Sequence, residues 1–262
     1  MTTPSCSTVL FCGTPKSGKT VYFSVIADYL THLCARNRDC RYRFFAANND
    51  SVQFVDDVLA AMKKGEWPLN TIAPANFEYA LILKGKIWDN ENRLIYGDYP
   101  GEVFQATYGD HRKYSAQKVH IDKLKADMDK ASGVCLLVDT VQLHDGGERH
   151  AILDCLSGFG RAVRGSEKKK RIAVVFTKKD CFLDGGSQDF DPEKTLCVDY
   201  PDAYQLLNEV HAKYFFVSSV ANPIVDSRGS IVPPSGYKSK NSINVLEPIC
   251  WILKINRGDF KE

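Results

Sequence analysis

The sequence contains 262 residues, of which 44% are hydrophobic and 25% charged, and its formal net charge at pH 7 is +2. This composition is that of a soluble globular protein, and the length suits a single α/β domain. The small net charge gives no reason to expect a nucleic acid or an acidic membrane as a partner. No apolar run reaches the roughly 20 residues that a transmembrane helix needs, so we expect no direct membrane anchor.

The nine cysteines form no CxxC spacing and no cluster with histidine. Several lie inside apolar runs, as Cys12, Cys135 and Cys250 do, where cysteine behaves as a small buried hydrophobe. The N-terminus carries no secretory signal. We therefore expect the protein in a reducing cytoplasm.

The hydrophobic pattern alternates between strands and helices along most of the chain. Strands are predicted at residues 7–12, 41–47, 77–84, 93–96, 133–139, 171–176 and 214–218. Helices are predicted at residues 21–34, 51–64, 115–130, 150–163, 202–211 and 242–255. Irregular structure is expected at residues 65–76, 103–114, 181–200 and 221–241, the last of these as a surface loop rich in Pro, Ser and Gly.

This order of elements predicts an α/β fold of three layers, with a mostly parallel sheet and helices on both faces. Residues 77–84 and 93–96 should pair as a hairpin, which gives the sheet one antiparallel edge strand. Ligands bind to such a sheet at the carboxyl ends of its strands. Functional side chains are therefore expected where strands end.

The clearest motif is a glycine-rich loop between the first strand and the first helix. Gly13, four further residues and then Gly18, Lys19 and Thr20 fit the GxxxxGK[ST] pattern of a phosphate-binding P-loop. Strand, loop and helix in this order surround an anion with backbone N–H groups and a helix N-terminus. Lys19 would reach the terminal phosphates, and the Thr20 hydroxyl would bind Mg²⁺. The sequence therefore predicts a P-loop NTPase-type fold that binds a nucleoside triphosphate, rather than a chance Gly/Lys turn.

A second motif follows the strand predicted at residues 93–96. Asp98 occupies the position of a carboxylate that holds Mg²⁺ through its water shell. Asp98 also opens a DxxG pattern that ends at Gly101, whose N–H group would meet the γ-phosphate. Asp and Gly are common turn residues, so the pattern alone is weak evidence for a phosphate site. Its position after a strand supports that interpretation.

A third motif ends the strand predicted at residues 171–176. Thr177, Lys178, Lys179 and Asp180 fit the [NT]KxD pattern that reads guanine. The Asp180 carboxylate would accept from N1–H and the N2 amino group together, and adenine offers no such pair of donors. The alternative is a basic turn after a strand. The short segment that follows the last strand, Ser219 and Val220 included, could offer a backbone N–H group to the guanine O6.

In this order, and each at the end of a strand, these motifs resemble those of the Ras-like small GTPases over roughly residues 7–255. The resemblance implies one Ras-like domain over residues 1–262 that binds GTP or GDP with Mg²⁺. It implies that the first switch supplies a threonine to Mg²⁺, and Thr71 is best placed for it. Implied nucleotide-binding residues are Gly13, Pro15, Lys16, Ser17, Gly18, Lys19, Thr20, Thr177, Lys178, Asp180, Ser219 and Val220; implied metal ligands are Thr20, Thr71 and Asp98; and implied catalytic residues are Lys19, Thr71, Gly101 and Glu102.

The sequence departs from the Ras-like pattern in three places. Residues 36–69 are longer than the corresponding segment of a minimal Ras-like domain, and we interpret them as an added strand and helix. In this respect the chain is similar to the bacterial Ras-like proteins of the "double-GTPase" group. The second departure is Glu102, which stands where the Ras pattern has a water-orienting glutamine. Val220 also replaces the usual alanine of the final motif.

Three functions are compatible with these motifs. The first is a molecular switch that hydrolyses GTP slowly and acts with a protein effector or activator. The second is an interaction module that holds GTP and barely hydrolyses it, a hypothesis that Glu102 keeps open. The third is a P-loop ATPase or kinase, although no Arg-rich lid is found and the TKKD motif would have no role in a kinase.

Overall fold

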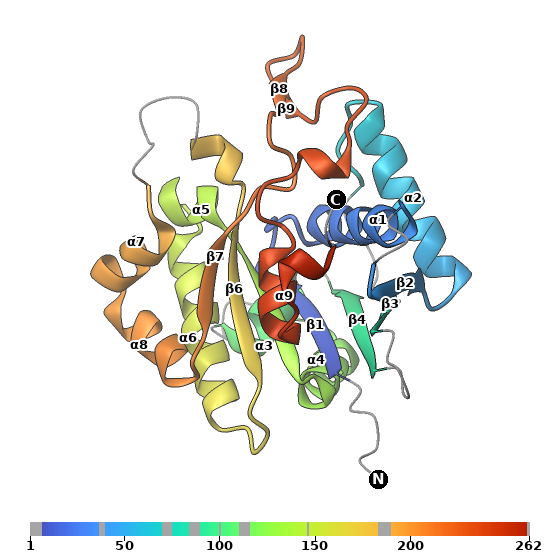
Figure 1. Ribbon diagram of the computed structural model, residues 1–262. Helices are drawn as coiled ribbons and strands as arrows, with labels where there is room; N and C mark the ends of the chain where they lie inside the picture. The colour runs from blue at the N-terminus through green and yellow to red at the C-terminus, as the bar shows by residue number, and fades with distance from the viewer. Residues whose placement is uncertain are drawn as a thin grey trace.

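The computed structural model describes residues 7–36, 40–69, 75–83, 90–99, 101–109, 116–145, 147–182 and 190–260. Its centre is a seven-stranded sheet with the strand order β2-β3-β4-β1-β5-β6-β7 (Figure 1). The strands are β1 (Ser7–Gly13), β2 (Tyr42–Ala46), β3 (Ala75–Leu83), β4 (Asn90–Asp98), β5 (Gly133–Asp139), β6 (Arg171–Thr177) and β7 (Lys213–Phe216). The predicted α/β fold with a mostly parallel sheet is confirmed.

The directions of the strands follow the predicted pattern. β1 is parallel to β4 and β5, β5 is parallel to β6, and β6 is parallel to β7. β3 is antiparallel to both β4 and β2, so the predicted hairpin is present. The antiparallel strand does not itself form the edge, because β2 from the added segment pairs with its outer side. β5 is buried along its whole length, as a strand with helices on both faces must be.

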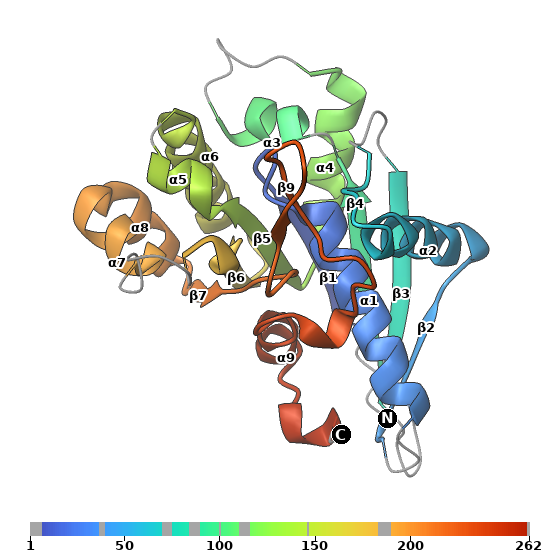
Figure 2. The same ribbon diagram turned by 90° about the horizontal axis from the view of Figure 1, so that it is seen from above.

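Helices cover both faces of the sheet, as Figure 2 shows from above. One hydrophobic core joins the sheet to α1, α2 and α9, and a second joins its other face to α3, α4, α6 and α8. The helices are α1 (Lys19–Arg36), α2 (Asn49–Lys63), α3 (Gly101–Tyr108), α4 (Lys118–Lys130), α5 (Thr140–Asp145), α6 (Arg149–Arg164), α7 (Pro192–Asp199), α8 (Pro201–Glu209) and α9 (Glu247–Leu253). Among the helices in the described ranges, none is long and apolar enough to cross a lipid bilayer.

The expectation of irregular structure at residues 103–114 is wrong where the chain is described, because Gly101–Tyr108 forms α3. Its buried rings pack on α6, where Tyr108 meets Phe159 edge to face with 5.5 Å between ring centroids. The two helices approach closely at Gly158, where an added Cβ atom would lie 1.7 Å from the Tyr108 carbonyl oxygen. This long-range packing stabilises a helix that its short local pattern did not reveal.

Two other boundaries also differ from the predictions. Part of the expected loop 181–200 forms α7, which Asp191 caps by accepting from the N–H groups of Glu193 and Lys194. The predicted helix 242–255 begins only at Glu247 because Asn244 has a left-handed φ of 58°.

The surface loop at 221–241 contains a small hairpin of β8 (Ile224–Val225) and β9 (Ile231–Val232), followed by a 3₁₀ turn. This hairpin projects at the top of Figure 1. Its turn is held by Asp226, whose carboxylate accepts from the N–H groups of Arg228 and Ser230. Such local bonds by Asp are typical of tight turns. Part of the predicted loop is therefore a regular hairpin, where the two short strands pair.

Candidate nucleotide-binding site

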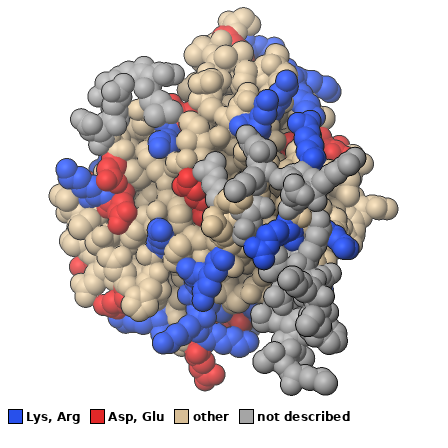
Figure 3. Space-filling view, in the orientation of Figure 1, with Lys and Arg blue, Asp and Glu red and all other residues tan. Residues whose placement is uncertain are grey.

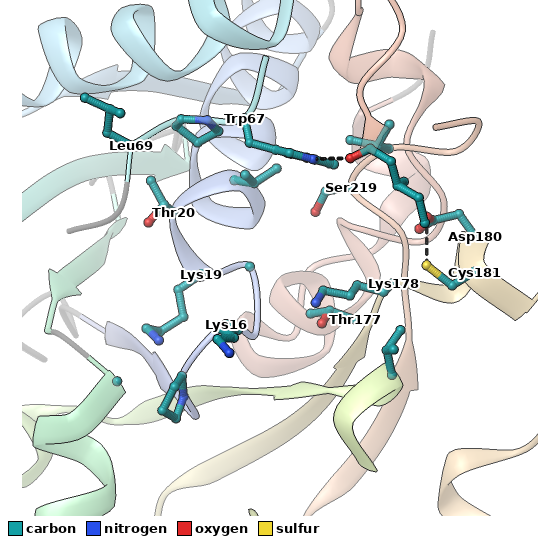
Figure 4. Close-up of a pocket in the computed structure, with 18 of the residues that line it drawn as sticks. Lys16, Lys19, Thr20, Trp67, Leu69, Thr177, Lys178, Asp180, Cys181 and Ser219 are labelled. Atoms are coloured by element: carbon teal, nitrogen blue, oxygen red, sulfur yellow. Dashed lines mark hydrogen bonds between the residues drawn. The ribbon is translucent and has the colours of Figure 1, made fainter. Parts of the chain in front are cut away.

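A pocket of about 700 Å³ opens at the carboxyl ends of the central strands (Figure 4). Its volume lies within the range of typical small-molecule sites. The pocket unites three of the predicted motifs, which are far apart in sequence. Its lining consists of Pro15, Lys16, Gly18, Lys19, Thr20, Val21, Trp67, Pro68, Leu69, Tyr99, Gly101, Glu102, Val141, Thr177, Lys178, Asp180, Cys181, Ser219, Val220 and Ile231.

The loop between β1 and α1 has a tightly determined shape. Gly13 packs against β5 so closely that an added Cβ atom would lie 2.1 Å from the Leu137 carbonyl oxygen. The Lys19 ammonium group donates to the carbonyl oxygens of Thr14, at 2.9 Å, and Gly13, at 3.3 Å. Ser17 is buried and its hydroxyl donates to the Thr14 carbonyl oxygen at 2.7 Å. Ser17 and Gly13 therefore shape the loop, while its other predicted residues face the pocket.

The predicted magnesium ligands are only partly described. Thr20 lines the pocket in the first turn of α1, and Asp98 is the last residue of β4, beside the end of β1. The side chain of Asp98, and the whole of Thr71, lie outside the described residues. Within the described part, no group of three or more His, Cys, Asp or Glu side chains could hold a metal ion. A hydroxyl and a carboxylate are oxygen ligands of the kind that Mg²⁺ prefers, so Thr20 and Asp98 fit this ion together with phosphate oxygens.

Gly101 brings the start of α3 against the P-loop. A Cβ atom added to Gly101 would lie 2.3 Å from the Cα atom of Pro15, so only glycine fits there without displacement of the backbone. The neighbouring Glu102 is exposed and lines the pocket. The predicted residues of this motif therefore lie next to the phosphate-binding loop, although they are 86 positions apart (101 − 15) in the sequence.

Asp180 stands on the opposite side of the pocket and is held by Ser218. The Ser218 hydroxyl donates to one carboxylate oxygen of Asp180. The Cys181 thiol donates to the other at 3.6 Å, as Figure 4 shows. Burial raises the pKa of Asp180, and the hydrogen bond from Ser218 opposes this shift. The carboxylate is thus partly desolvated and fixed in orientation, as a group that selects a base must be.

Lys178 and Thr177 are fixed by the neighbouring strand β5. The Lys178 ammonium group lies 2.7 Å from a carboxylate oxygen of Asp139, which is fully buried. The other oxygen of Asp139 accepts from the N–H groups at the start of α5. The Thr177 hydroxyl donates to the Val138 carbonyl oxygen at 3.1 Å. This network fixes the Lys178 side chain at the pocket, where Figure 4 shows it.

The final motif contains one residue more than the sequence indicated. Ser218 was not predicted, yet its hydroxyl both orients Asp180 and accepts from the Val220 N–H group at 3.2 Å. The side chain of Val220 is buried, and its N–H group already has an acceptor in Ser218. Ser219 lines the pocket, and within the described residues its N–H group has no hydrogen-bond acceptor. The only signal for Ser218 in the sequence was its place as the last residue of the strand predicted at 214–218.

The pocket also has an apolar wall that the sequence did not reveal. Trp67 follows α2, and its indole N–H group donates to the Ile231 carbonyl oxygen of β9 at 2.7 Å (Figure 4). Leu69 belongs to the same wall and is 92% exposed. Trp67 and Ile231 are 164 positions apart in the sequence. No local pattern could predict a contact over this separation.

The strand, P-loop and helix around one pocket define a P-loop nucleotide-binding protein. A sequence profile of the family described as Double-GTPase 1 matches residues 10–146, just over half of the chain. The protein belongs to this Double-GTPase 1 family, and it is a GTP-binding protein of a GTPase family. The matched segment includes the P-loop and the Asp98–Gly101 motif, whereas Asp180 and Ser219 lie beyond it.

Solved structures of two other proteins are similar in fold. One was solved as the structure of the mammalian SRP receptor, with 13% identity, a TM-score of 0.46, and coverage of 95% of this chain and 100% of the other. The second is a candidate nucleolar GTP-binding protein 1 of Plasmodium falciparum, with 11% identity, a TM-score of 0.44, and coverage of 97% and 87%. The comparison with curated proteins found no similar sequence.

Proposed function

We propose that this protein is a molecular switch that binds GTP with Mg²⁺, hydrolyses it slowly and signals its nucleotide state to a partner protein. The observation that carries the proposal is the single pocket that unites Lys19, Glu102 and Asp180. Three separate motifs of the sequence meet there, and each carries groups that could bind one part of a nucleotide. One pocket could thus hold the phosphates, the metal ion and the base.

The phosphates would lie on the P-loop. Lys19 is held across the loop by two carbonyl oxygens, which keeps its charge near the start of α1. The helix N-terminus attracts the same anion. Thr20 and Asp98 would hold Mg²⁺, which neutralises the charge that develops on the β- and γ-phosphates. The N–H group of Gly101 would meet the γ-phosphate, so the position of α3 would depend on whether this phosphate is present.

The base would lie between Lys178 and Asp180. An ionised Asp180 can accept from N1–H and the N2 amino group of guanine, which adenine cannot match. The Ser219 N–H group is the better candidate to meet the guanine O6, because the Val220 N–H group already donates to Ser218. Buried polar groups that would lose their partners with the wrong base account for strong discrimination.

The segment expected to form the first switch offers a route to a partner. Leu69 and Trp67 directly precede the segment that contains Thr71, and both are exposed at the pocket. We expect this rim to be the surface that a protein effector or activator contacts when GTP is bound. Figure 3 shows basic side chains in several groups on one face, with some acidic side chains between them. The net charge of only +2 gives no reason to expect a nucleic acid as the partner. The proposal includes one Ras-like domain over residues 1–262, and a cytoplasmic location.

The proposal is tested by nucleotide binding and by single-turnover hydrolysis. GTP should displace a fluorescent GDP analogue far more effectively than ATP does, and Mg²⁺ should slow release of the analogue. Hydrolysis of bound GTP should be measurable but slow. A preference for ATP would favour the ATPase or kinase hypothesis. Tight GTP binding without any hydrolysis would favour the interaction module, which the exposed Glu102 in the pocket keeps as the second candidate.

A further inference from the structure

The hydroxyl of Thr20 has a partner on the neighbouring strand β4. The Tyr96 phenol oxygen lies 3.0 Å from the Thr20 Oγ1 atom, which is hydrogen-bond distance. Tyr96 is fully buried, and it lies two positions before Asp98 on the strand that ends at the pocket. Thr20 itself lies beside Lys19 in the first turn of α1 (Figure 4). A buried phenol is thus in contact with the side chain that would bind Mg²⁺.

This contact is compatible with a metal ion. A threonine hydroxyl has one proton to donate and two lone pairs that can accept. One lone pair can face Mg²⁺, while the other lone pair or the proton serves the bond to Tyr96. The contact also selects an orientation, because threonine in a helix divides between rotamers that place its hydroxyl differently. The bond to Tyr96 favours the rotamer in which the Thr20 oxygen is turned toward β4.

The Tyr96 ring is held firmly by other aromatic rings. It stacks on Phe23 of α1, with 4.9 Å between centroids and an angle of 20° between the planes. On the added helix α2, Phe54 stacks with it at 5.6 Å, and Phe54 in turn stacks on Phe77 of β3 at 3.8 Å. Packed rings of this kind have few alternative positions. The phenol oxygen is therefore held in one place by rings of α1 and of the added helix α2.

We propose that Tyr96 is a positioning residue of the metal site, which holds the Thr20 hydroxyl ready for Mg²⁺. This inference rests on the proposed function, in which Thr20 binds that ion. Groups that orient a metal ligand commonly change the affinity for the metal when they are removed. Tyr96 would act only through Thr20, with no contact to the nucleotide.

The test is the dependence of GDP release on the concentration of free Mg²⁺. Release of a fluorescent GDP analogue is followed at increasing Mg²⁺ in the wild type and in Tyr96→Phe, which removes a single oxygen atom. We expect the Mg²⁺ concentration at half-maximal slowing to rise about 3- to 10-fold in Tyr96→Phe, the range of one hydrogen bond. Binding of Mn²⁺, followed by electron paramagnetic resonance, should weaken by a similar factor.

Tyr79→Phe is a matched control. Tyr79 is buried in the same aromatic cluster, where its ring meets Phe23 at 5.8 Å, but its hydroxyl donates to the Ser51 carbonyl oxygen. This variant should keep the Mg²⁺ midpoint of the wild type. If Tyr96→Phe also keeps it, or if both variants shift it equally, Tyr96 has no positioning role. Release that is insensitive to Mg²⁺ in the wild type would refute the metal site itself, and this inference with it.

A second variant covers the case in which Tyr96→Phe does not fold. Phe54→Leu removes a stacking partner of the Tyr96 ring and leaves the phenol oxygen in place. Because the ring is then less firmly held, the Mg²⁺ midpoint should rise about 2-fold or more while GDP affinity in excess Mg²⁺ stays the same. An unchanged midpoint would contradict the proposal.

Discussion

The hydrogen bond from Ser218 to Asp180 can be removed with one substitution, Ser218→Ala. Ser218 is fully buried, and its hydroxyl donates to the carboxylate that would read guanine. The variant leaves Asp180 in the pocket but takes away a group that orients and stabilises its charged form. We expect Ser218→Ala to bind GTP and GDP more weakly than the wild type.

The size of the effect follows from the kind of bond. A hydrogen bond to a charged group contributes about 1.5–3 kcal/mol, which corresponds to a roughly 10- to 100-fold loss of affinity if Asp180 is not reoriented by another donor. The pH dependence should also change. Burial raises the pKa of Asp180 and the Ser218 bond lowers it, so the variant has a still higher pKa. Because only the ionised carboxylate accepts both guanine donors, affinity falls as the pH drops through this pKa, and in Ser218→Ala the fall begins at higher pH.

The assay is displacement of a fluorescent GDP analogue by GTP over a range of pH from about 4 to 8, which begins at the ordinary pKa of an aspartate side chain and extends above it. Ser24→Ala is the control, because Ser24 is equally buried and its hydroxyl has no partner among the described residues. This control should retain the affinity and pH profile of the wild type. An unchanged affinity and pH profile in Ser218→Ala would refute the role given to the Ser218–Asp180 bond.

The remaining predictions concern the phosphates, the base and the rate. Lys19→Ala should abolish measurable GTP binding, because it deletes the charge held across the P-loop; binding by a variant with an unchanged circular dichroism spectrum would refute the phosphate site. Asp180→Asn should weaken GTP strongly and improve binding of xanthosine triphosphate, whose 2-oxo group can accept from the new amide; unaltered GTP affinity in competition assays would favour the ATPase or kinase hypothesis. Glu102→Gln should hydrolyse GTP faster than the wild type in single-turnover assays.

The central fold could be predicted because its signals are local. Each buried strand is a short apolar run with a turn on either side, and β5 and β6 begin and end within one residue of their predicted bounds. The P-loop is a contiguous motif between a strand and a helix. Its position at the sheet follows from the rule that ligands meet the carboxyl ends of parallel strands. These features need no knowledge of distant contacts.

The remaining parts of the site depend on contacts between distant segments. Ser218 meets Asp180 across 38 positions, and Trp67 meets Ile231 across 164. Neither pair has a spacing that secondary structure would reveal. The helix α3 forms for a similar reason, since its buried rings need the surface of α6. Local patterns therefore indicated where the site lies, but not which side chains orient its functional groups.

We expect the rate of hydrolysis to depend on the charge of Glu102. This residue lies in the first turn of α3, which Gly101 holds against the P-loop, so its carboxylate is near the expected γ-phosphate. A carboxylate is a better base than the neutral glutamine of the Ras pattern, but it is also repelled by the phosphate. Phosphoryl transfer gains mainly from the placement and stabilisation of charge, so we expect the repulsion to dominate.

The composition of the pocket supports the same expectation. Among the residues of the described ranges that line it, the cations are lysines and none is an arginine that could stabilise the transition state. We therefore expect slow hydrolysis by the isolated protein, acceleration by Glu102→Gln, and a larger acceleration by a partner that supplies a cation. Glu102→Ala separates repulsion from base action, because it removes the charge without adding a group that orients water. Fast hydrolysis by the wild type that both substitutions abolish would show that Glu102 is the catalytic base and that base action outweighs repulsion.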